Sequence, residues 1–419
     1  MRPLAIRRRE ARLLPPLAVL VRSMAYVDVK MRWKKDASFD AAPVLSQARD
    51  LRPLVSLAGL LSPSPTPVSA VSKLRRSLET PDRRVISFLR RFPAAFVESV
   101  GPEHNHPWFR LSGSAARLLQ EERRIFAARR ADITFRLRRL LLMTPRRRLP
   151  LRVAQGMLWH LGLPEDYFRC RDYDIAQDGF QILTIGDSVC REEEEDDGRE
   201  LVLIDNGEHQ ELPKSVLEMD AMRRFGSAEV VPIPLFQSKG LRLKQKIEAW
   251  LEGFQKLPYV SPYEDFSGID RGSDVSEKRV VGVLHELLSL FVTCSAERRR
   301  LLCLRQHLGL PQKFHRVFER HPHVFYLLLR EKTCFVVLKE AYMARGDTVI
   351  EEHPMLEMRR KYTGLMEESR EIIKCRRSGK PFPSKHEDHE QIEDSESANS
   401  APFLYHHSQT GVFPVFPGE

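Results

Sequence analysis

The five-residue sequence HLGLP occurs twice in this chain, at His160–Pro164 and again at His307–Pro311. After each copy come an aromatic residue, a short stretch with helical spacing, and a run of β-branched and aromatic residues. Similarity of this kind indicates repeated structural units. Because proline disfavours a helical conformation in the residue before it, each HLGLP is expected to end a helix.

Two hairpins are expected downstream of the two copies. Phe180–Ile185 (FQILTI) is expected to pair with Leu201–Ile204 (LVLI), and Phe325–Leu329 (FYLLL) with Cys334–Leu338 (CFVVL). Each pair is rich in β-branched or aromatic residues and flanks a polar turn, which is the pattern of a β-hairpin. The loop of the first pair contains the acidic run EEEEDD at Glu192–Asp197, which no hydrophobic core would accept.

An earlier stretch has the same order of elements. A helix ending FLRRFP (Phe88–Pro93) precedes FVESV, a Gly-Pro turn and WFRL, and it is similar to VFERHP at Val317–Pro322. The sequence therefore predicts three helix–helix–β-hairpin units of a winged-helix-like kind. The fold class expected is α+β, predominantly α-helical. The alternative is that short identical motifs recur for packing alone.

The net charge is divided unevenly along the chain of 419 residues. The whole chain carries 67 Lys and Arg against 57 Asp and Glu, a formal charge of +10. Residues 1–152 contain 32 basic residues, 28 of them Arg, and 12 acidic residues, a net of 32 − 12 = +20. Residues 153–419 contain the other 35 basic residues and the other 45 acidic residues, a net of −10. Such asymmetry indicates a polyanion-binding surface or a basic targeting arm at one end.

The first 27 residues contain six arginines and the single acid Glu10, among Leu, Ala, Ile and Val. This composition is typical of an organelle transit peptide, which we predict for residues 1–27. The scarcity of Ser favours a mitochondrion over a chloroplast, and an ordinary basic arm is the alternative. No stretch has enough uninterrupted apolar residues for a membrane-spanning helix. Residues 378–419 are predicted to form a disordered tail.

The basic residues of the first half lie at helical spacing between apolar positions, so arginines are expected to line the outer faces of helices. Arginine binds phosphate bidentately and stacks on bases, which favours nucleic acid over a merely solvated surface. A single pair of adjacent basic residues more often serves solubility. All the basic clusters of the first half taken together, however, predict RNA binding. The predicted RNA-binding residues are Lys30, Arg32, Trp33, Lys34, Lys35, Arg83, Arg84, Arg90, Arg91, Arg123, Arg124, Arg129, Arg130, Arg136, Arg138, Arg139, Arg146, Arg147 and Arg148.

Catalytic and metal-binding patterns are weak. Asp172, Asp174 and Glu192–Glu195 have the composition of a two-metal nuclease site, yet no base or lysine completes it, and an acidic loop is usually solvated. Two histidine pairs lack a third metal ligand. The six dispersed cysteines include no C-x-x-C pair and indicate reduced thiols. We therefore expect no catalytic centre and no metal site.

Several ordered blocks of the chain are similar to the plant organelle RNA recognition (PORR) domain family, over residues 28–366. The resemblance begins at VKMRWKKDASFD (Val29–Asp40) and includes the Arg-rich segment RLLLMTPRRRLPL (Arg139–Leu151). It is densest in EKRVVGVLHELLSLF (Glu277–Phe291), LPQKFHRVFERHPHVFYLLL (Leu310–Leu329) and HPMLEMRRKY (His353–Tyr362). A long string of specific blocks in one order is stronger than any single motif above.

The resemblance implies a nuclear-encoded plant protein of mitochondria or, as the alternative, chloroplasts. Such a protein binds organelle transcripts that contain group II introns and promotes their splicing with other organelle splicing factors, without enzymatic activity or cofactor. The alternative function is a DNA-binding, winged-helix-like regulator of organelle transcription. The resemblance assigns no base-contacting residues, so the RNA-binding set rests on charge and spacing.

The chain departs from the family pattern in its second unit. The stretch DYDIAQDGFQI has no proline before the aromatic strand, and Arg191–Gly198 is unusually acidic. The second unit is therefore expected to be structural or to face a protein partner, while the first unit faces RNA. Reversing the charges of Arg136, Arg138 and Arg139 is expected to abolish RNA binding, whereas neutralising Glu192–Glu195 is not.

Overall fold

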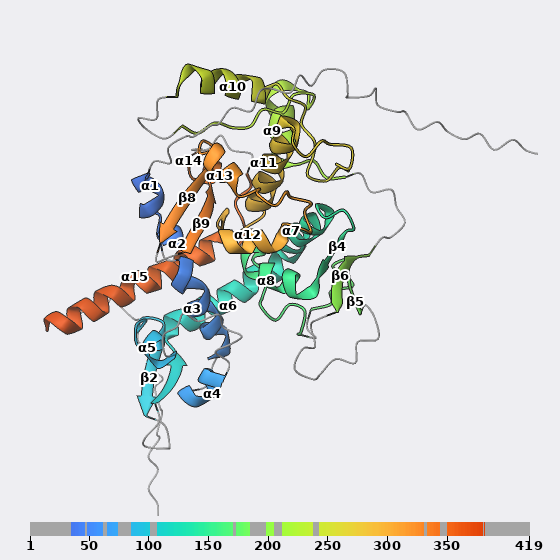
Figure 1. The fold of residues 1–419 in the computed structure, drawn as a ribbon. Helices are drawn as coiled ribbons and strands as arrows, with labels where there is room; N and C mark the ends of the chain where they lie inside the picture. The colour runs from blue at the N-terminus through green and yellow to red at the C-terminus, as the bar shows by residue number, and fades with distance from the viewer. Residues whose placement is uncertain are drawn as a thin grey trace, which may run out of the picture.

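The computed structural model (Figure 1) describes residues 35–46, 48–61, 65–73, 85–100, 107–170, 173–184, 198–204, 212–237, 243–330, 333–343, 350–379 and 381. About half of the structure is helical, and the strands form small antiparallel sheets, which confirms the predicted α+β class. The predicted transit peptide at 1–27 lies outside the described residues, as does nearly all of the predicted tail at 378–419. No helix in the described part is long and apolar enough to cross a membrane.

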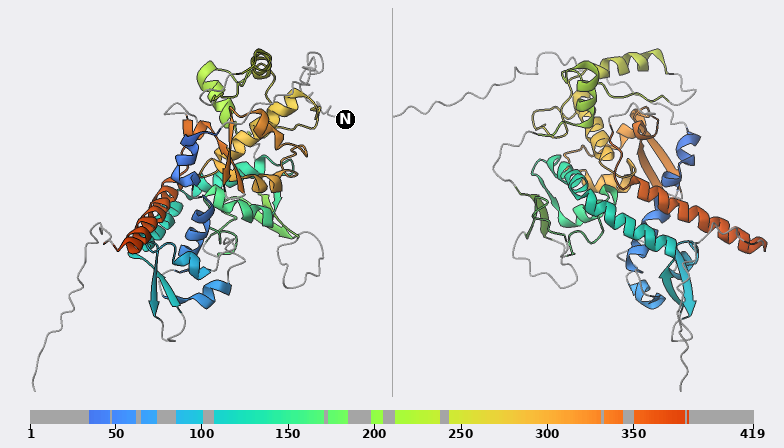
Figure 2. Two further views of the ribbon diagram at one scale, coloured as in Figure 1. Left: turned by 60° about the vertical axis from the view of Figure 1, so that its left-hand side comes forward. Right: turned by 180° about the vertical axis from the view of Figure 1, so that it is seen from behind.

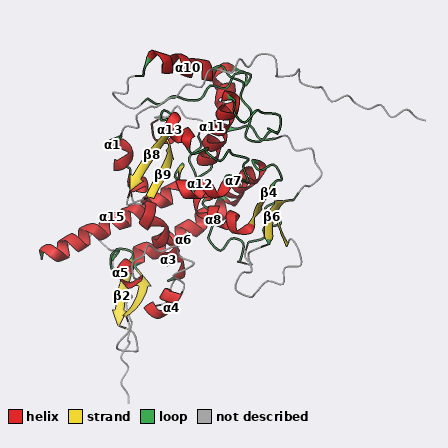
Figure 3. Ribbon diagram, viewed as in Figure 1, coloured by secondary structure: helices red, strands yellow, loops and turns green. Residues whose placement is uncertain are grey.

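Three sheets occur in the described part of the chain, each with three antiparallel strands in the order first, third, second. The sheets are separate from one another, as Figure 3 shows. The predicted hairpin pairings are confirmed; Phe180 lies opposite Leu203, and Phe325 lies opposite Leu338. The short first strand of each sheet was not predicted, because two or three residues show no periodic pattern. The strands are β1 (Thr66–Pro67), β2 (Phe96–Val100), β3 (Pro107–Leu111), β4 (Arg148–Pro150), β5 (Phe180–Thr184), β6 (Arg199–Leu203), β7 (Ser295–Glu297), β8 (Phe325–Arg330) and β9 (Thr333–Leu338).

Helices precede each sheet in a common order. We call the segments that contain the three sheets the first unit (48–111), the second unit (130–203) and the third unit (274–338). In each unit a long helix comes before the short strand, and shorter helices or turns lie between that strand and the hairpin. The helices of the units are α3 (Ala48–Leu60), α4 (Val68–Lys73), α5 (Val85–Leu89), α7 (Arg130–Leu142), α8 (Leu151–Leu161), α11 (Asp274–Ser289), α12 (Arg298–Leu304) and α13 (Arg316–Arg320).

The longest described helix, α15 (Leu356–Ser378), packs against α6 (Gly113–Ala128), and the two lie side by side in Figure 2. The Tyr362 hydroxyl on α15 donates to the Glu122 carboxylate on α6 at 2.9 Å. Helix α15 extends through Arg370–Arg377 and ends at Ser378, before Gly379 with its φ of 67°. The remaining helices are α1 (Ala37–Ala41), α2 (Pro43–Ser46), α9 (Val216–Phe225), α10 (Gln245–Gln255) and α14 (Glu340–Met343).

Both HLGLP copies end a helical segment through the same turn. Gly162 has a φ of 76° and Gly309 a φ of 63°, the left-handed conformation that glycine adopts most readily at a helix end. The Leu163 N–H donates to the Leu158 carbonyl at 3.0 Å, and the second copy makes the equivalent bond at 2.9 Å. The leucines on both sides of each glycine are buried. The repeated motif is therefore a helix-ending turn whose leucines anchor it in the core.

A buried phenylalanine begins the hairpin of every unit. Phe96, Phe180 and Phe325 are each 3% exposed or less. The first and third units have a proline three residues earlier, whereas the second unit has none. There Gly179, with a φ of 85°, makes the turn, and the Phe180 N–H donates to the Ile175 carbonyl at 2.9 Å. The missing proline therefore does not change how the second hairpin begins.

The hydrophobic clusters join the units into one body. The largest cluster of the described residues is shared by the second and third units, with α11 inside it; residues 278–289 of that helix are all buried. Another cluster joins the first unit to α15 through Met358 and Tyr362. A smaller one covers β8 and β9, where Phe39 of α1 stacks on Tyr326 with ring centroids 4.5 Å apart. The relative positions of the units are therefore set by packing.

The neutral imidazole of His353 links the first HLGLP turn to the start of α15. Its Nε2–H donates to the Leu161 carbonyl at 2.9 Å, and its Nδ1 accepts the Met355 N–H at 3.0 Å. The ring is 4% exposed. Burial, followed by the charges of Arg136 and Arg359, holds the pKa of His353 well below its ordinary value.

Acid is therefore expected to destabilise the fold through His353. Below about pH 6.5 this histidine binds a proton in the unfolded chain but stays neutral in the native protein. The free energy of unfolding therefore falls by up to about 1.4 kcal/mol per pH unit as the pH is lowered. The substitution His353→Gln removes this contribution to the pH dependence of stability. The stability advantage of the wild-type protein over the variant should narrow by about 2 kcal/mol between pH 7 and pH 5 in urea denaturation. A constant difference would contradict the assignment.

Candidate nucleic-acid interface

The predicted RNA-binding residues do not form one continuous group. Those on α6 and in the turn before β4 are exposed, whereas on α7 Arg136 is buried and the other three are half-buried. The difference arises because α7 packs against α6, α8 and β6, and also carries side chains that reach α11. Part of the set lies outside the described residues: Lys30, Arg32, Trp33, Lys34, Arg83 and Arg84.

Arg139 is bound inside the fold. Its guanidinium donates to Glu286 at 2.6 Å, to the Tyr263 hydroxyl at 2.9 Å and to the Lys214 carbonyl at 2.9 Å. The Glu286 side chain is 1% exposed and also accepts the Val216 N–H at 2.8 Å. Burial lowers the pKa of Arg139, but the charge of Glu286 outweighs burial, with help from Tyr263, and the pKa lies above its ordinary value. The Arg139 guanidinium therefore serves a structural contact within the fold.

Other predicted arginines of α7 also stabilise the fold. Arg136 is 9% exposed and donates to a main-chain carbonyl of α11 at 3.4 Å, and burial lowers its pKa. Arg130 donates twice to Asp178, at 2.8 and 3.1 Å. Arg138 is half-buried, with Nη1 close against Gly179. The charge reversal expected to abolish RNA binding would therefore disturb the fold, because two of its three targets carry buried charge.

Another group of predicted cations is at the surface and paired with acids. Arg90 donates twice to Glu98, at 2.6 and 2.9 Å; these bonds raise the pKa of the guanidinium and lower the pKa of the carboxyl. Exposed pairs contribute only about 0–1 kcal/mol, so a phosphate can replace the carboxylate at little cost. The other pairs, with nitrogen–oxygen distances of 2.7–3.3 Å, are Arg91–Asp50, Lys35–Asp40, Arg129–Asp132 and Arg148–Glu200.

The arginines most available to a ligand are exposed and form no ion pair with an acid among the described residues. We call them the exposed arginine set: Arg123, Arg124, Arg146 and Arg147. The first two lie on α6, and the other two lie in the turn that leads into β4. Thr144 holds this turn, since its carbonyl accepts the Arg147 N–H at 3.0 Å. The turn presents its arginines at the edge of the second sheet.

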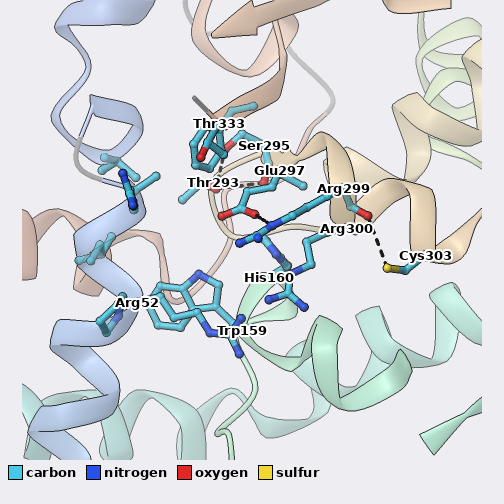
Figure 4. Close-up of a pocket in the computed structure, with 17 residues that line it drawn as sticks. Arg52, Trp159, His160, Thr293, Ser295, Glu297, Arg299, Arg300, Cys303 and Thr333 are labelled. Carbon is cyan, nitrogen blue, oxygen red and sulfur yellow. Dashed lines mark hydrogen bonds and ion pairs between the residues drawn. The ribbon is translucent and has the colours of Figure 1, made fainter. Parts of the chain in front are cut away.

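A cleft of about 540 Å³ lies where the three units meet, and we call it the junction cleft (Figure 4). Helix α3 of the first unit forms one wall, and β7 with α12 of the third unit forms the opposite wall. Trp159 and His160, at the end of α8 in the second unit, lie between these walls. Each unit therefore contributes to one concave surface.

The lining of the junction cleft is basic. Arg49 and Arg52 come from α3, and Arg299 and Arg300 come from α12. Glu297 is the one acidic residue among the lining residues, so their formal charges sum to 4 − 1 = +3. Glu297 is bonded to Arg299, whose side chain is nevertheless 72% exposed. The cleft thus combines a positive lining with access from solvent.

None of the four cleft arginines was in the predicted set. The triplet Arg298–Arg300 was visible in the sequence, but it lies in the half of the chain with a net negative charge. Arg49 and Arg52 are not part of a basic run, so composition did not single them out. Residues about 250 positions apart along the chain therefore line one cleft, which the sequence alone does not indicate.

A second basic groove, of about 690 Å³, lies beside the C-terminal part of α15. Arg91 and Phe92 of the first unit line one part of it. Arg370, Lys374 and Arg377 line the other part, at the spacing that places side chains on one face of a helix. No acidic residue is among its lining residues. The groove extends the basic surface of the first unit onto α15.

The acidic and histidine patterns do not form a metal site in the part of the chain that the structure describes, where no three His, Cys, Asp or Glu side chains lie together. Asp174 instead stabilises a turn, because its carboxylate accepts two main-chain N–H groups at 3.0 and 3.2 Å. His321 binds Glu277 at 2.8 Å and packs edge-on against His323. The run Glu192–Asp197 lies outside the described residues.

Comparison with known proteins places these features in a family. The family model of the plant organelle RNA recognition domain matches residues 34–371. The matched range contains the three units, the exposed arginine set, the junction cleft and most of α15. No solved structure matches the chain significantly.

Curated relatives cover most of the chain. Protein WHAT'S THIS FACTOR 9, mitochondrial, from Arabidopsis thaliana is 45% identical over 385 residues, which is 90% of this chain and 96% of the relative. Protein WHAT'S THIS FACTOR 1, chloroplastic, from Zea mays is 28% identical over 82% of this chain and 68% of the relative. The first of these supports the predicted mitochondrial location. The chain belongs to the plant organelle RNA recognition domain family.

Proposed function

We propose that this protein binds mitochondrial transcripts containing group II introns and promotes their splicing, without catalysing the reaction itself. Membership of an RNA recognition family supports organelle RNA as the ligand. The structural observation that carries the proposal is the exposed arginine set, whose guanidinium groups meet solvent with no acidic partner among the described residues. Guanidinium groups in this state are suited to bidentate binding of phosphate.

The architecture of the units supports a winged-helix-like assignment. Each unit has a long helix, a short strand, a helix and a hairpin, with the sheet order first, third, second. In DNA-binding proteins of the helix-turn-helix class, the second helix enters the major groove. The helices just before the first and third hairpins, α5 and α13, have only five residues each, and turns replace this helix in the second unit. Such short helices reach few base edges, which makes DNA regulation the weaker candidate.

A competition binding assay distinguishes RNA binding from DNA binding. Labelled intron RNA is bound to the purified protein, and unlabelled RNA or duplex DNA of equal length is added. We expect RNA to displace the probe at a concentration at least about tenfold lower than DNA, because unpaired RNA offers bases and 2′-hydroxyl groups as well as phosphates. Equal displacement by both competitors would favour the regulator of transcription.

Replacing the four residues of the exposed arginine set by alanine is expected to weaken RNA binding at least about tenfold. Each phosphate contact to a single strand contributes about 0.7 to the slope of log affinity against log salt. The loss of four contacts therefore lowers that slope by up to about 3. Fluorescence anisotropy at several salt concentrations measures both changes.

A matched control removes the same charge elsewhere. Lys246, Arg271, Lys313 and Arg316 are exposed and lie outside the exposed arginine set and both basic grooves. Their replacement by alanine should change RNA affinity by less than about threefold, through net charge alone. If the control weakens binding as much as the exposed arginine set, the RNA surface is misplaced.

The splicing role is tested in plants that lack the protein. Unspliced precursors of particular mitochondrial group II introns are expected to accumulate, and RNA that co-purifies with the tagged protein should be enriched in the same introns. Normal splicing in these plants, with RNA still bound, would leave RNA recognition standing and refute the splicing proposal. Protein partners that co-purify after ribonuclease treatment would identify other splicing factors.

A further inference from the structure

We propose that the junction cleft holds an unpaired segment of RNA, about one or two nucleotides long, between α3 and α12. This inference rests on the proposed RNA-binding function and specifies the form of RNA that is bound at one site. The cleft arginines are distinct from the exposed arginine set and come from different helices. None of the RNA-binding residues predicted from the sequence lines this cleft, so the site is inferred from the structure alone.

The guanidinium groups of the cleft are arranged to meet a phosphodiester backbone. Arg52 lies on one side of the cleft and Arg299 and Arg300 on the other, as Figure 4 shows. A single strand carries one negative charge per nucleotide, and the planar guanidinium fork matches phosphate oxygens. The Arg299 side chain is 72% exposed, whereas the side chain of its partner Glu297 is only 18% exposed. A phosphate therefore reaches Arg299 from the solvent side and competes with the Glu297 carboxylate for its guanidinium.

Hydroxyl groups lie beside the arginines. Thr293, Ser295 and Thr333 line the cleft, and the hydroxyl oxygens of Thr293 and Ser295 are 2.8 Å apart. Hydroxyl side chains bind phosphate and sugar oxygens in nucleic-acid complexes, and the ribose 2′-hydroxyl can both donate and accept. An acidic peptide such as polyglutamate could bond to the arginines and to the hydroxyl groups, but it offers no planar base to Trp159, which also lines the cleft. The lining therefore fits RNA better.

Trp159 provides an aromatic surface for an unpaired base. It lines the cleft at the end of α8. The guanidinium of Arg359 lies 3.3 Å from the centroid of the Trp159 ring, so one face of the indole is covered. A base therefore meets the part of the ring that lines the cleft, since Trp159 also packs against the hydrophobic cluster of the first unit and α15. Stacking on an aromatic side chain contributes about 1–3 kcal/mol per base and tolerates any sequence.

His160 lies beside the cleft arginines but contributes no charge to the cleft. Burial, followed by the charges of Arg52, Arg300 and Arg359, lowers the pKa of His160 to about 3. The imidazole is therefore neutral near pH 7 and adds no charge to the lining. The charge of the cleft therefore comes from its arginines and from the carboxylates of Glu297 and Glu165, which bond to Arg299 and Arg52. His160 should give the affinity for phosphate no pH dependence between pH 6 and pH 8.

The dimensions of the cleft exclude a duplex. Its volume of about 540 Å³ is that of a small-ligand site. A paired A-form helix keeps its bases stacked inside and presents its phosphates on a broad surface, so it cannot enter a cleft of this size. Unpaired nucleotides can present a phosphate and a base to the same cleft. The site should therefore distinguish single strands from duplexes.

Cys303 makes occupation of the cleft measurable. This thiol is exposed and lines the cleft on α12, whereas Cys170 is half-buried and lies outside the lining. The full chain is alkylated with N-ethylmaleimide alone, with an unstructured polyuridine of about 20 nucleotides, with a duplex RNA of equal length, or with polyglutamate. Mass spectrometry then quantifies each cysteine. At about ten times the dissociation constant, polyuridine should slow alkylation of Cys303 about tenfold and leave Cys170 unchanged.

A variant with matched control completes the test. Replacing Arg49, Arg299 and Arg300 by alanine should weaken polyuridine binding about 10–100-fold, since charge-assisted contacts are lost, and should abolish the protection of Cys303. The control variant replaces Arg271, Lys313 and Arg316, exposed residues outside the cleft, and should retain both. Thermal melting of all three proteins confirms that they are folded.

Each outcome of these experiments supports or contradicts the assignment of the junction cleft to unpaired RNA. Protection by duplex RNA as strong as that by polyuridine, or protection by polyglutamate alone, would overturn the proposal and assign the cleft to duplex RNA or to an acidic protein. If anisotropy shows that polyuridine binds while Cys303 stays reactive, RNA lies elsewhere and only the cleft assignment fails. If no RNA binds under any condition, the proposed function fails as well.

Discussion

Glu286→Ala is expected to lower the free energy of unfolding by about 3–5 kcal/mol. The carboxylate is buried inside the fold, where it accepts bonds from Arg139 and Tyr263 at 2.6 Å each and from the Val216 N–H at 2.8 Å. Its removal leaves a guanidinium that is 13% exposed without its counter-charge. An uncompensated buried charge costs far more than an exposed ion pair contributes. Urea denaturation followed by circular dichroism measures the change.

Two companion variants separate charge from shape. Glu286→Gln keeps the volume and one oxygen acceptor but removes the charge, so it should still be destabilised, by less than the alanine variant. Arg139→Ala should be destabilised to a similar extent as Glu286→Ala, because it leaves the carboxylate buried without its partner. If Arg139→Ala instead kept full stability and lost RNA affinity, Arg139 would return to the RNA surface.

Gly309→Ala is expected to lower the free energy of unfolding by about 2–5 kcal/mol. The glycine has a φ of 63°, a conformation that costs an alanine about 1–2 kcal/mol. An added Cβ would lie 2.1 Å from the ring of Phe266. That ring cannot move away easily, because the Arg279 guanidinium lies 3.6 Å from the ring centroid. Overpacking of this kind typically costs about 1–3 kcal/mol more.

Gly226→Ala is the matched control for the effect of φ. Its φ is 70°, at the end of α9, but a Cβ there has nothing within 4 Å. The control should therefore lose only about 1–2 kcal/mol. Gly162→Ala should resemble Gly309→Ala, since its Cβ would lie 2.5 Å from the ring of His353. Equal losses at Gly226 and Gly309 would show that backbone strain alone governs the motif.

The local structure of the units could be predicted from the sequence. The strands that start at Phe180 and Phe325 are bounded by turn residues, and their apolar pattern spans neighbours only a few positions apart. HLGLP ends a helical segment because of glycine and proline within the motif itself. The short strands β1, β4 and β7 were missed, since they exist only where a neighbouring hairpin offers hydrogen bonds.

The candidate site could be predicted only in part. Arg123 and Arg139 lie in the same Arg-rich segment at similar helical spacing, yet one is exposed and the other is bound to Glu286. The periodic pattern distinguishes an apolar face from a polar one, but it does not show whether a polar face meets solvent or another helix. The exposed arginine set lies at the surface, whereas Arg136 and Arg139 bind partners inside the fold, and the pattern did not separate the two groups.

The sequence by itself determined the repeated units, their hairpins and the helix-ending turns, because glycine, proline and the apolar period act on residues close along the chain. The family membership also follows from the order of its sequence blocks. Only the tertiary structure decided which arginines are structural and which line the junction cleft. Glu286 is 147 residues from Arg139, and α12 is far along the chain from α3. Burial of a charge and the lining of a cleft depend on such distant neighbours, whose positions are set by packing of the shared core.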